Sequence, residues 1–266
     1  MKGILYVAAR SARLHPPAFR RGLVAARGLS TGLTPSGATP LTLEQALTSN
    51  HLIISELESP AAMQQLEAVR AGGDTLAKWQ ATNAVLVHAT LRVLPQLGYP
   101  ADGLGLQQYS DAFASCMRSD SEEVRSTLRG LNDAKWRVLL KAAFGCEPAA
   151  PLELAQARAI VLDMVDALQD DAFLKQVEEA RTGLAARLSD QERQHMVARA
   201  LLSVQQDVVA KHGFAGDAGY AQAQVCLMEH AADAVVTASI AAATNNVYAR
   251  AGINLQEVLR QATSGA

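Results

Sequence analysis

The amino-acid sequence predicts an all-α protein without a β-sheet, in which two tandem helical units pack as a multi-helix bundle. The first observation is composition: 49% of the 266 residues are apolar and 5% are aromatic, which is enough for a buried core. The second is local preference, because alanine and leucine dominate and clusters of β-branched residues are sparse. The third is internal repetition, since blocks of the first half recur in the second.

The first 39 residues differ in charge from the rest of the chain. They hold six basic residues and no acid, and the first carboxylate is Glu44. Because Arg-rich, acid-free leaders with Ser and Thr are typical of organellar presequences, we expect residues 1–39 to be a mitochondrial transit peptide, with the chloroplast as alternative. A basic tail that binds anionic partners is the other interpretation. A secretory signal is disfavoured, because the apolar run at residues 4–9 is very short.

Without this leader the chain is acidic. The whole sequence has 24 basic and 26 acidic residues, so removing the six leader cations leaves 18 basic residues and a formal charge of −8. The expected helices carry no stripe of Lys and Arg, and we therefore predict no nucleic-acid binding. No apolar run approaches the roughly 18 residues of a spanning helix, so we also expect no transmembrane segment.

The three cysteines, Cys116, Cys146 and Cys226, lie far apart in the sequence and form no CxxC pair. This spacing argues against a disulfide framework and against a zinc knuckle. We expect them to be reduced thiols in the core.

Three blocks of sequence recur in the same order. Residues 40–46 recur at 151–157 and residues 65–72 at 176–183, both with an offset of 111, whereas residues 98–103 recur at 213–218 with an offset of 115. Three collinear matches indicate a duplication with a four-residue insertion between the blocks. The predicted organisation is a presequence at 1–39, a first helical repeat at 40–145, a linker at 146–151, a second helical repeat at 152–250 and a C-terminal tail at 251–266.

In the first repeat, Thr42 and Gln45 are spaced as a capping box that opens the first helix. Pro95 falls inside the long helix of this repeat and should kink or end it near residues 91–94, because proline lacks a backbone N–H. The motif at residues 119–122 should open a later helix that carries Trp136 and ends before Gly145.

In the second repeat, the spacing of apolar residues predicts helices at 152–168 and at about 173–188. Ser189 and Glu192 form a capping box for a long third helix, which should end at Lys211–His212–Gly213. The apolar stripe of this helix comprises Val197, Leu201, Val204 and Val208. Asp217 is expected to cap a fourth helix, and the last, alanine-rich helix is expected to end near Asn245 and Asn246.

The runs at residues 203–214 and 98–105, with Tyr109 after the latter, resemble a family of small helical proteins called protein C-ten. The openings at 154–157 and 178–181 are also similar to that family, so the resemblance covers about residues 40–145 and 151–245. It implies a helical fold and supplies no established catalytic activity or cofactor. The chain departs from the family in being doubled and in carrying a presequence, so the cytosolic setting of the family is not carried over.

One cluster could in principle bind a transition metal: Cys226, Glu229, His230 and Asp233 follow i, i+3, i+4, i+7 spacing on one predicted helix. It has no second ligand pair, and the first repeat has no equivalent. We therefore expect Cys226 in the core and Glu229 and Asp233 in solvent, and we assign no catalytic, cofactor-binding or metal-binding residue.

Three further histidines, His88, His195 and His212, are isolated in the sequence, and His212 is explained by the dipole at a helix end. Gly98, Gly103 and Gly105 are expected to form a turn between helices, because neither a preceding strand nor a following Lys-Ser/Thr marks a phosphate loop.

Two classes of function follow from these observations. The first is a non-catalytic structural or interaction protein with protein partners, an accessory subunit of a large mitochondrial assembly. The alternative is a small-molecule-binding protein or enzyme with a site at the repeat interface. We also expect the two repeats to pack about a pseudo-two-fold axis near the linker.

Overall fold

The computed structural model describes residues 41–117, 121–182, 189–231 and 233–254. Within these ranges the chain forms ten α-helices, one 3-10 helix and one π-helix, and no β-strand. The all-α multi-helix bundle predicted from the sequence is therefore confirmed. The predicted presequence lies outside the described residues. None of the described helices combines the length and hydropathy needed to cross a membrane.

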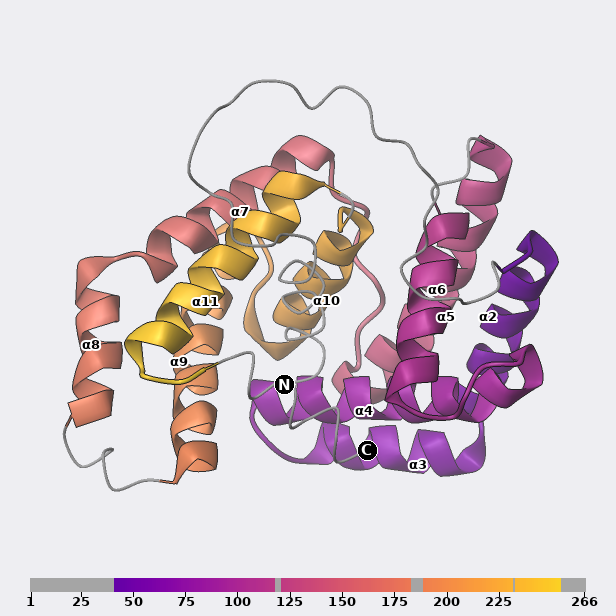
Figure 1. Ribbon diagram of the computed structural model, residues 1–266, viewed down its shortest axis with the longest axis horizontal. Helices are drawn as coiled ribbons and strands as arrows, with labels where there is room; N and C mark the ends of the chain where they lie inside the picture. The colour runs from indigo at the N-terminus through magenta and orange to yellow at the C-terminus, as the bar shows by residue number, and fades with distance from the viewer. Residues whose placement is uncertain (1–40, 118–120, 183–188, 232, 255–266) are drawn as a thin grey trace.

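The helices follow one another in two series (Figure 1). The first series comprises α2 (Leu43–Leu57), α3 (Pro60–Ala71), α4 (Thr75–Val93), the 3-10 helix η1 (Leu94–Leu97), α5 (Gly103–Cys116) and α6 (Glu122–Phe144). The second comprises α7 (Leu154–Leu168), α8 (Asp171–Thr182), α9 (Asp190–Lys211), α10 (Gly216–Glu229), the π-helix η3 (Val235–Ser239) and α11 (Ile240–Arg250). Of the helix predicted at about 173–188, the last six residues lie outside the described part.

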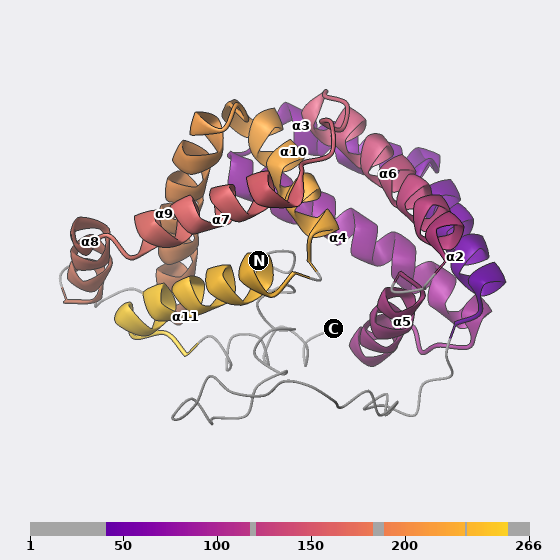
Figure 2. The same ribbon diagram turned by 90° about the horizontal axis from the view of Figure 1, so that it is seen from above.

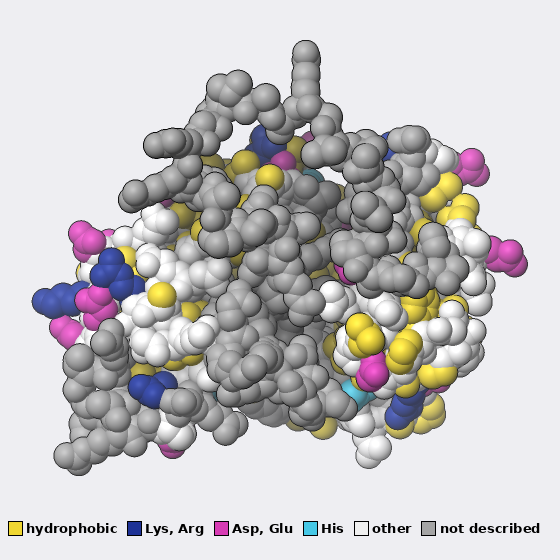
Figure 3. Space-filling model, viewed as in Figure 1, with side chains coloured by type: hydrophobic (Ala, Val, Ile, Leu, Met, Phe, Trp, Pro, Cys, Tyr) yellow, Lys and Arg dark blue, Asp and Glu magenta, His cyan; other side chains and the backbone are white. Residues whose placement is uncertain are grey.

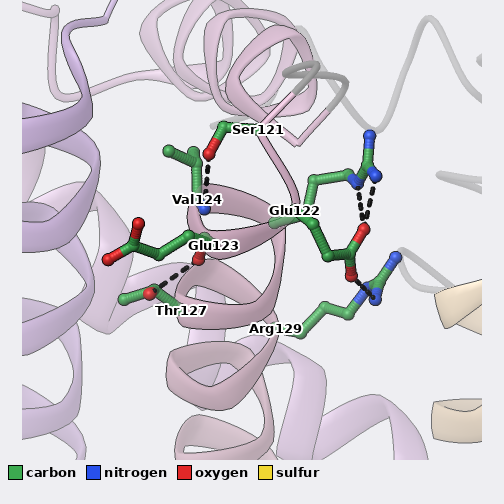
Figure 4. A network of polar contacts seen from close by, with 7 residues as sticks. Ser121, Glu122, Glu123, Val124, Thr127 and Arg129 are labelled. Atoms are coloured by element: carbon green, nitrogen blue, oxygen red, sulfur yellow. Dashed lines mark hydrogen bonds and ion pairs between the residues drawn. The ribbon is translucent and has the colours of Figure 1, made fainter.

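Local sequence signals set most helix ends. Thr42 and Gln45 form the capping box of α2, and Ser189 and Glu192 form that of α9. The amide of Val124 donates to the side chain of Ser121, which caps α6 (Figure 4). These contacts satisfy amide groups that the first helical turn leaves without partners.

Three of the predicted helix ends are also found. α4 stops at Val93 and gives way to the 3-10 helix that contains Pro95. α6 ends at Gly145 with φ 70°, and α9 is followed by Gly213 with φ 92°, so both glycines adopt the left-handed conformation that ends a helix.

Two predicted boundaries are wrong. Asp217 does not cap α10, whose N-cap is Ala215; its carboxylate accepts instead from donors on α4 in the first series. The last helix runs to Arg250 rather than to Asn245, because Val247 and Tyr248 continue its buried face. Gly252, with φ 72°, follows the actual end.

The two series correspond in length and spacing. α2 and α7 each span 15 residues, and α3 and α8 each span 12, with starts 111 residues apart as in the sequence repeat. Near the start of α5 a Cβ at Gly105 would lie 1.9 Å from the Pro100 carbonyl oxygen, and near the start of α10 a Cβ at Gly219 would lie 2.3 Å from the Phe214 carbonyl carbon. These two close approaches are 114 residues apart, one fewer than the offset of 115 in the sequence blocks, and the duplication stays a prediction.

The core is continuous between the two series. One cluster of buried side chains takes in residues of α2, α4 and α6 and also residues of α7, α9 and α10, while a second cluster lies among α7, α8, α9 and α11. The series meet where α10 packs on α6 and α9 packs on α4. Of the predicted stripe on α9, Val197, Leu201 and Val208 are buried and Val204 is half-buried.

The expected pseudo-two-fold packing is not found in the described residues. Such symmetry would place α5 against α11 in the way that α10 packs on α6, whereas α5 packs against α2, α4 and η1. Figure 2 shows α5 and α11 on the same side of the molecule but at its opposite ends. α10 therefore occupies a position between the units that its counterpart in the first series does not share.

Candidate functional site

An aromatic cluster forms the centre of the junction between the two units. The Trp79 ring of α4 stacks on Trp136 of α6, with centroids 5.8 Å apart, and lies 6.4 Å from Phe144. Tyr220 of α10 meets Trp79 edge-on at 6.2 Å, and its hydroxyl donates to Gln205 Oε1 at 3.1 Å. Trp79 is 1% exposed and Tyr220 is 0% exposed, so the second unit inserts a ring into the core of the first.

Polar contacts surround this cluster at the start of α4. Asp217 of α10 accepts from the Thr75 hydroxyl and forms an ion pair with Lys78 Nζ at 3.0 Å. From α9, Gln206 Nε2 donates to Thr75 at 2.9 Å, and Arg199 forms a 2.6 Å ion pair with Asp74, the N-cap of α4.

These contacts change the pKa of both carboxyl groups. The hydrogen bond from Thr75 and then the pair with Lys78 lower the pKa of Asp217, against the opposing effect of burial. The backbone amide of Ala77 and then Arg199 lower the pKa of Asp74, also against burial. Both carboxylates are thus held ionised at the junction.

The linker runs along α10. Gln222 Nε2 donates to the Glu147 carbonyl at 2.7 Å, and the Cys226 thiol lies 3.7 Å from the Ala150 carbonyl oxygen. The His230 ring donates from Nε2 to the Leu152 carbonyl at 2.8 Å. Gln222 and Cys226 of α10 and its C-cap His230, one turn apart, therefore fix the linker to the second unit.

A cavity of about 230 Å³ lies between α6, the linker and α10. Charged side chains line it from all three segments, and proline, valine and cysteine form its apolar wall. The lining residues are Asp133, Arg137, Glu147, Pro148, Ala149, Pro151, Val225, Cys226 and Glu229.

Two carboxyl groups in this cavity are destabilised in their ionised form. Burial raises the pKa of Asp133, against the attraction of Arg137 and Arg129. Partial burial and then the charge of Asp133 raise the pKa of Glu229, although this residue is exposed overall. Burial, followed by the charges of Glu229 and Asp133, raises the pKa of the Cys226 thiol to about 11, so this cysteine is a protonated thiol rather than a nucleophile at neutral pH.

The cations near these carboxylates have other partners. Arg137 and Lys141 both approach Glu147, each at 3.6 Å. Arg129 reaches back to Glu122 at 3.4 Å near the start of α6, as Figure 4 shows. Among the described residues, Asp133 and Glu229 form neither an ion pair nor a hydrogen bond through their carboxylates.

The four residues weighed as possible metal ligands do not lie on one helix. α10 ends at Glu229, so Asp233 lies beyond the helix on which the i, i+7 spacing depended. Cys226 is buried and Glu229 is exposed, as expected. Asp233 is not solvated as expected: it is half-buried, pairs with Arg158 at 2.6 Å and accepts from the amides of Val235 and Val236. The described residues contain no group of three or more potential metal ligands.

The other residues considered from the sequence have structural positions. His212 at the end of α9 donates from Nε2 to Asp163 at 2.8 Å, so its partner is a carboxylate as well as the helix dipole. Gly98, with φ 81°, ends η1, and Gly105 allows the start of α5 to approach Pro100. Cys226 is buried, whereas Cys116 and Cys146 are only half-buried; all three are unpaired thiols.

Sequence reasoning did not single out the cavity residues Asp133 and Arg137 or the junction residue Trp79. The rarity of tryptophan could have pointed to Trp79, because the chain has only two tryptophans. The two rings stack on each other in the junction. No local pattern marks Asp133, since its neighbours Glu147 and Glu229 lie on other segments.

Comparison with protein-family models, with curated proteins and with solved structures gives no match to this chain. The resemblance to the protein C-ten family therefore stays an inference from the quoted motifs.

Proposed function

We propose that this chain is a non-catalytic interaction protein: a rigid helical body that serves as an accessory subunit of a larger mitochondrial assembly. The two units would present their outer helix faces to protein partners in a fixed relative orientation. The duplication of one helical unit is part of this proposal.

The observation that supports it best is the junction. The Trp79–Tyr220 contact and the ion pairs Asp74–Arg199 and Lys78–Asp217 tie the units together on apolar and polar sides alike. An interface with this much buried aromatic surface does not hinge easily, so the spacing of surface groups on the two units is constant. Constant spacing is what a scaffold requires to bind two partner surfaces at once.

A second observation is the use of polar side chains. His212 is paired with Asp163, His230 with the linker and Asp233 with Arg158. Each of these groups, which could act in acid–base chemistry, instead fixes one segment to another.

The surface is consistent with protein contacts of mixed charge. Around α8, Figure 3 shows Lys and Arg side chains interspersed with Asp and Glu. Arg250 pairs with Glu178 at 2.5 Å, and Lys175 approaches Glu179 at 4.0 Å. The mitochondrial setting is supported by the acid-free, Arg-rich leader of the sequence.

The test is isolation of the endogenous protein through a C-terminal tag, followed by native electrophoresis of the mitochondrial fraction. We expect migration with a large complex and a partner in stoichiometric amount. Migration as a free monomer, or recovery from another compartment, would contradict the proposal.

The cavity between α6, the linker and α10 favours a second candidate function, the binding of a small molecule at the repeat interface. Its volume of about 230 Å³ lies below the roughly 300–1,000 Å³ typical of sites for drug-sized ligands. This size is the reason for preferring the interaction function.

A further inference from the structure

We propose that the cavity between α6, the linker and α10 is a socket for one arginine side chain of a partner protein, held by Asp133 and Glu229. This inference rests on the proposed interaction function and names the chemistry of the partner.

The charge in the cavity is unbalanced. The lining contains three carboxylates, Asp133, Glu147 and Glu229, and one cation, Arg137. Arg137 and Lys141 each lie 3.6 Å from Glu147, so this carboxylate has two cations beside it. The two carboxylates left over come from opposite units and face the same space.

Among the described residues, neither Asp133 nor Glu229 has a cation within ion-pairing distance, because Arg137 and Arg129 pair with Glu147 and Glu122. Burial raises the pKa of Asp133 despite the attraction of Arg137 and Arg129, and burial followed by the charge of Asp133 raises the pKa of Glu229. A cation placed between them would remove that repulsion and stabilise both ionised forms. The overall charge of −8 outside the leader favours approach of a basic partner.

The walls fit a long side chain better than a bare ion. Pro148, Pro151 and Val225 provide an apolar surface for a methylene stem, and the carboxylates are placed for its charged end. Arginine is preferred over lysine because its planar guanidinium can bond two carboxylates at once through separate N–H groups.

The experiment uses the peptide acetyl-Gly-Arg-Gly-amide as probe and follows the backbone amide signals of Val225 and Cys226 by NMR. A peptide with citrulline in place of arginine is the matched ligand control, since it keeps the shape and loses the charge. We expect saturable shifts with the arginine peptide and about tenfold or weaker binding of the citrulline peptide, in line with the loss of charge-assisted hydrogen bonds.

The variant Asp133→Asn/Glu229→Gln is the test on the protein side. It should fold, because it keeps the side-chain shapes and removes two charges that repel one another. It should bind the arginine peptide about tenfold more weakly or worse. Glu123→Gln, an exposed change on the same helix α6 and outside the cavity, should bind like the unaltered protein. Peptide affinity should also rise with pH through the range in which Asp133 and Glu229 ionise.

Equal shifts with the arginine and citrulline peptides, no shift with either, or full binding by the double variant would each overturn the socket. These outcomes differ from failure of the proposed function. If the double variant still migrates with the large complex, the interaction function stands and the socket is wrong; if neither protein joins a complex, the interaction function itself fails.

Discussion

The substitution Tyr220→Ala tests whether the two units form one cooperative structure. Tyr220 is 0% exposed and contacts Trp79 edge-on across the junction. Truncating a buried aromatic side chain to alanine costs about 3–5 kcal/mol of unfolding free energy. The change also removes the hydroxyl that donates to Gln205, which is 3% exposed and would lose this partner.

Taking about 4 kcal/mol and a shift of roughly 2–4 °C per kcal/mol for a domain of this size, Tm should fall by about 8–16 °C. The assay is differential scanning calorimetry, with Tyr220→Phe as control. The control keeps the ring against Trp79 and should lose only about 1–3 kcal/mol through the unpaired Gln205 oxygen. One transition should shift as a whole in both variants. Two transitions, of which Tyr220→Ala moves only one, would refute the argument that the junction makes the units a single body.

Further predictions concern single positions elsewhere in the chain. Gly219→Ala should destabilise the protein, because the new Cβ would lie 2.3 Å from the Phe214 carbonyl carbon. In Gly130→Ala, on α6, the new Cβ meets nothing within 4 Å, so this change should stabilise the protein by about 0.5–1 kcal/mol. Denaturant titration measures the free energy of unfolding of both variants. Val208→Asp should prevent folding, because it places a carboxylate at a site that is 2% exposed. His230→Ala should cost about 1 kcal/mol of unfolding free energy, because it removes one hydrogen bond. A metal chelator should leave the Tm of the unaltered protein unchanged. The pKa of Asp217 is lowered in the folded state, so its stabilising effect is present above the ordinary pKa of a carboxyl group and is lost as pH falls through the lowered value. In melting experiments from pH 6 to pH 2, the Tm of Asp217→Asn should therefore fall less than the Tm of the unaltered protein. N-terminal sequencing of the mature protein should place its first residue between about positions 28 and 40, and intact Met1 in a cytosolic fraction would exclude the transit peptide.

Features that depend on neighbours in the sequence could be predicted without the structure. The capping boxes at Thr42 and Ser189 join residues three positions apart, so spacing alone identifies them. Pro95 ends α4 because of its own missing N–H, whatever surrounds it. The all-α class follows in the same way from helix formers along the chain.

Predictions were less accurate for side chains that could bond either to a neighbour in the sequence or to a residue far away in it. Asp217 could have capped α10, but the Thr75 hydroxyl and the Lys78 ammonium, 142 and 139 residues away, bind its carboxylate instead. Asp233 could have stayed in solvent, but Arg158 lies 75 residues earlier and beside it in the fold. Side-chain donors far away in the sequence thus bind both carboxylates, and no pattern in the local sequence identifies those donors.

The sequence by itself determined the helices, their caps and breaks, and the acidic character of the chain, because each depends on side chains within a turn or two or on simple sums of charge. The tertiary structure alone decided that α10 packs on α6, that Tyr220 enters the Trp79 cluster and that Asp133 and Glu229 face one cavity. The reason is physical: helices pack wherever apolar stripes are complementary, and several pairings satisfy the same stripes. Which pairing forms depends on the sum of all contacts in the folded chain, and the cavity and its charges follow from that pairing.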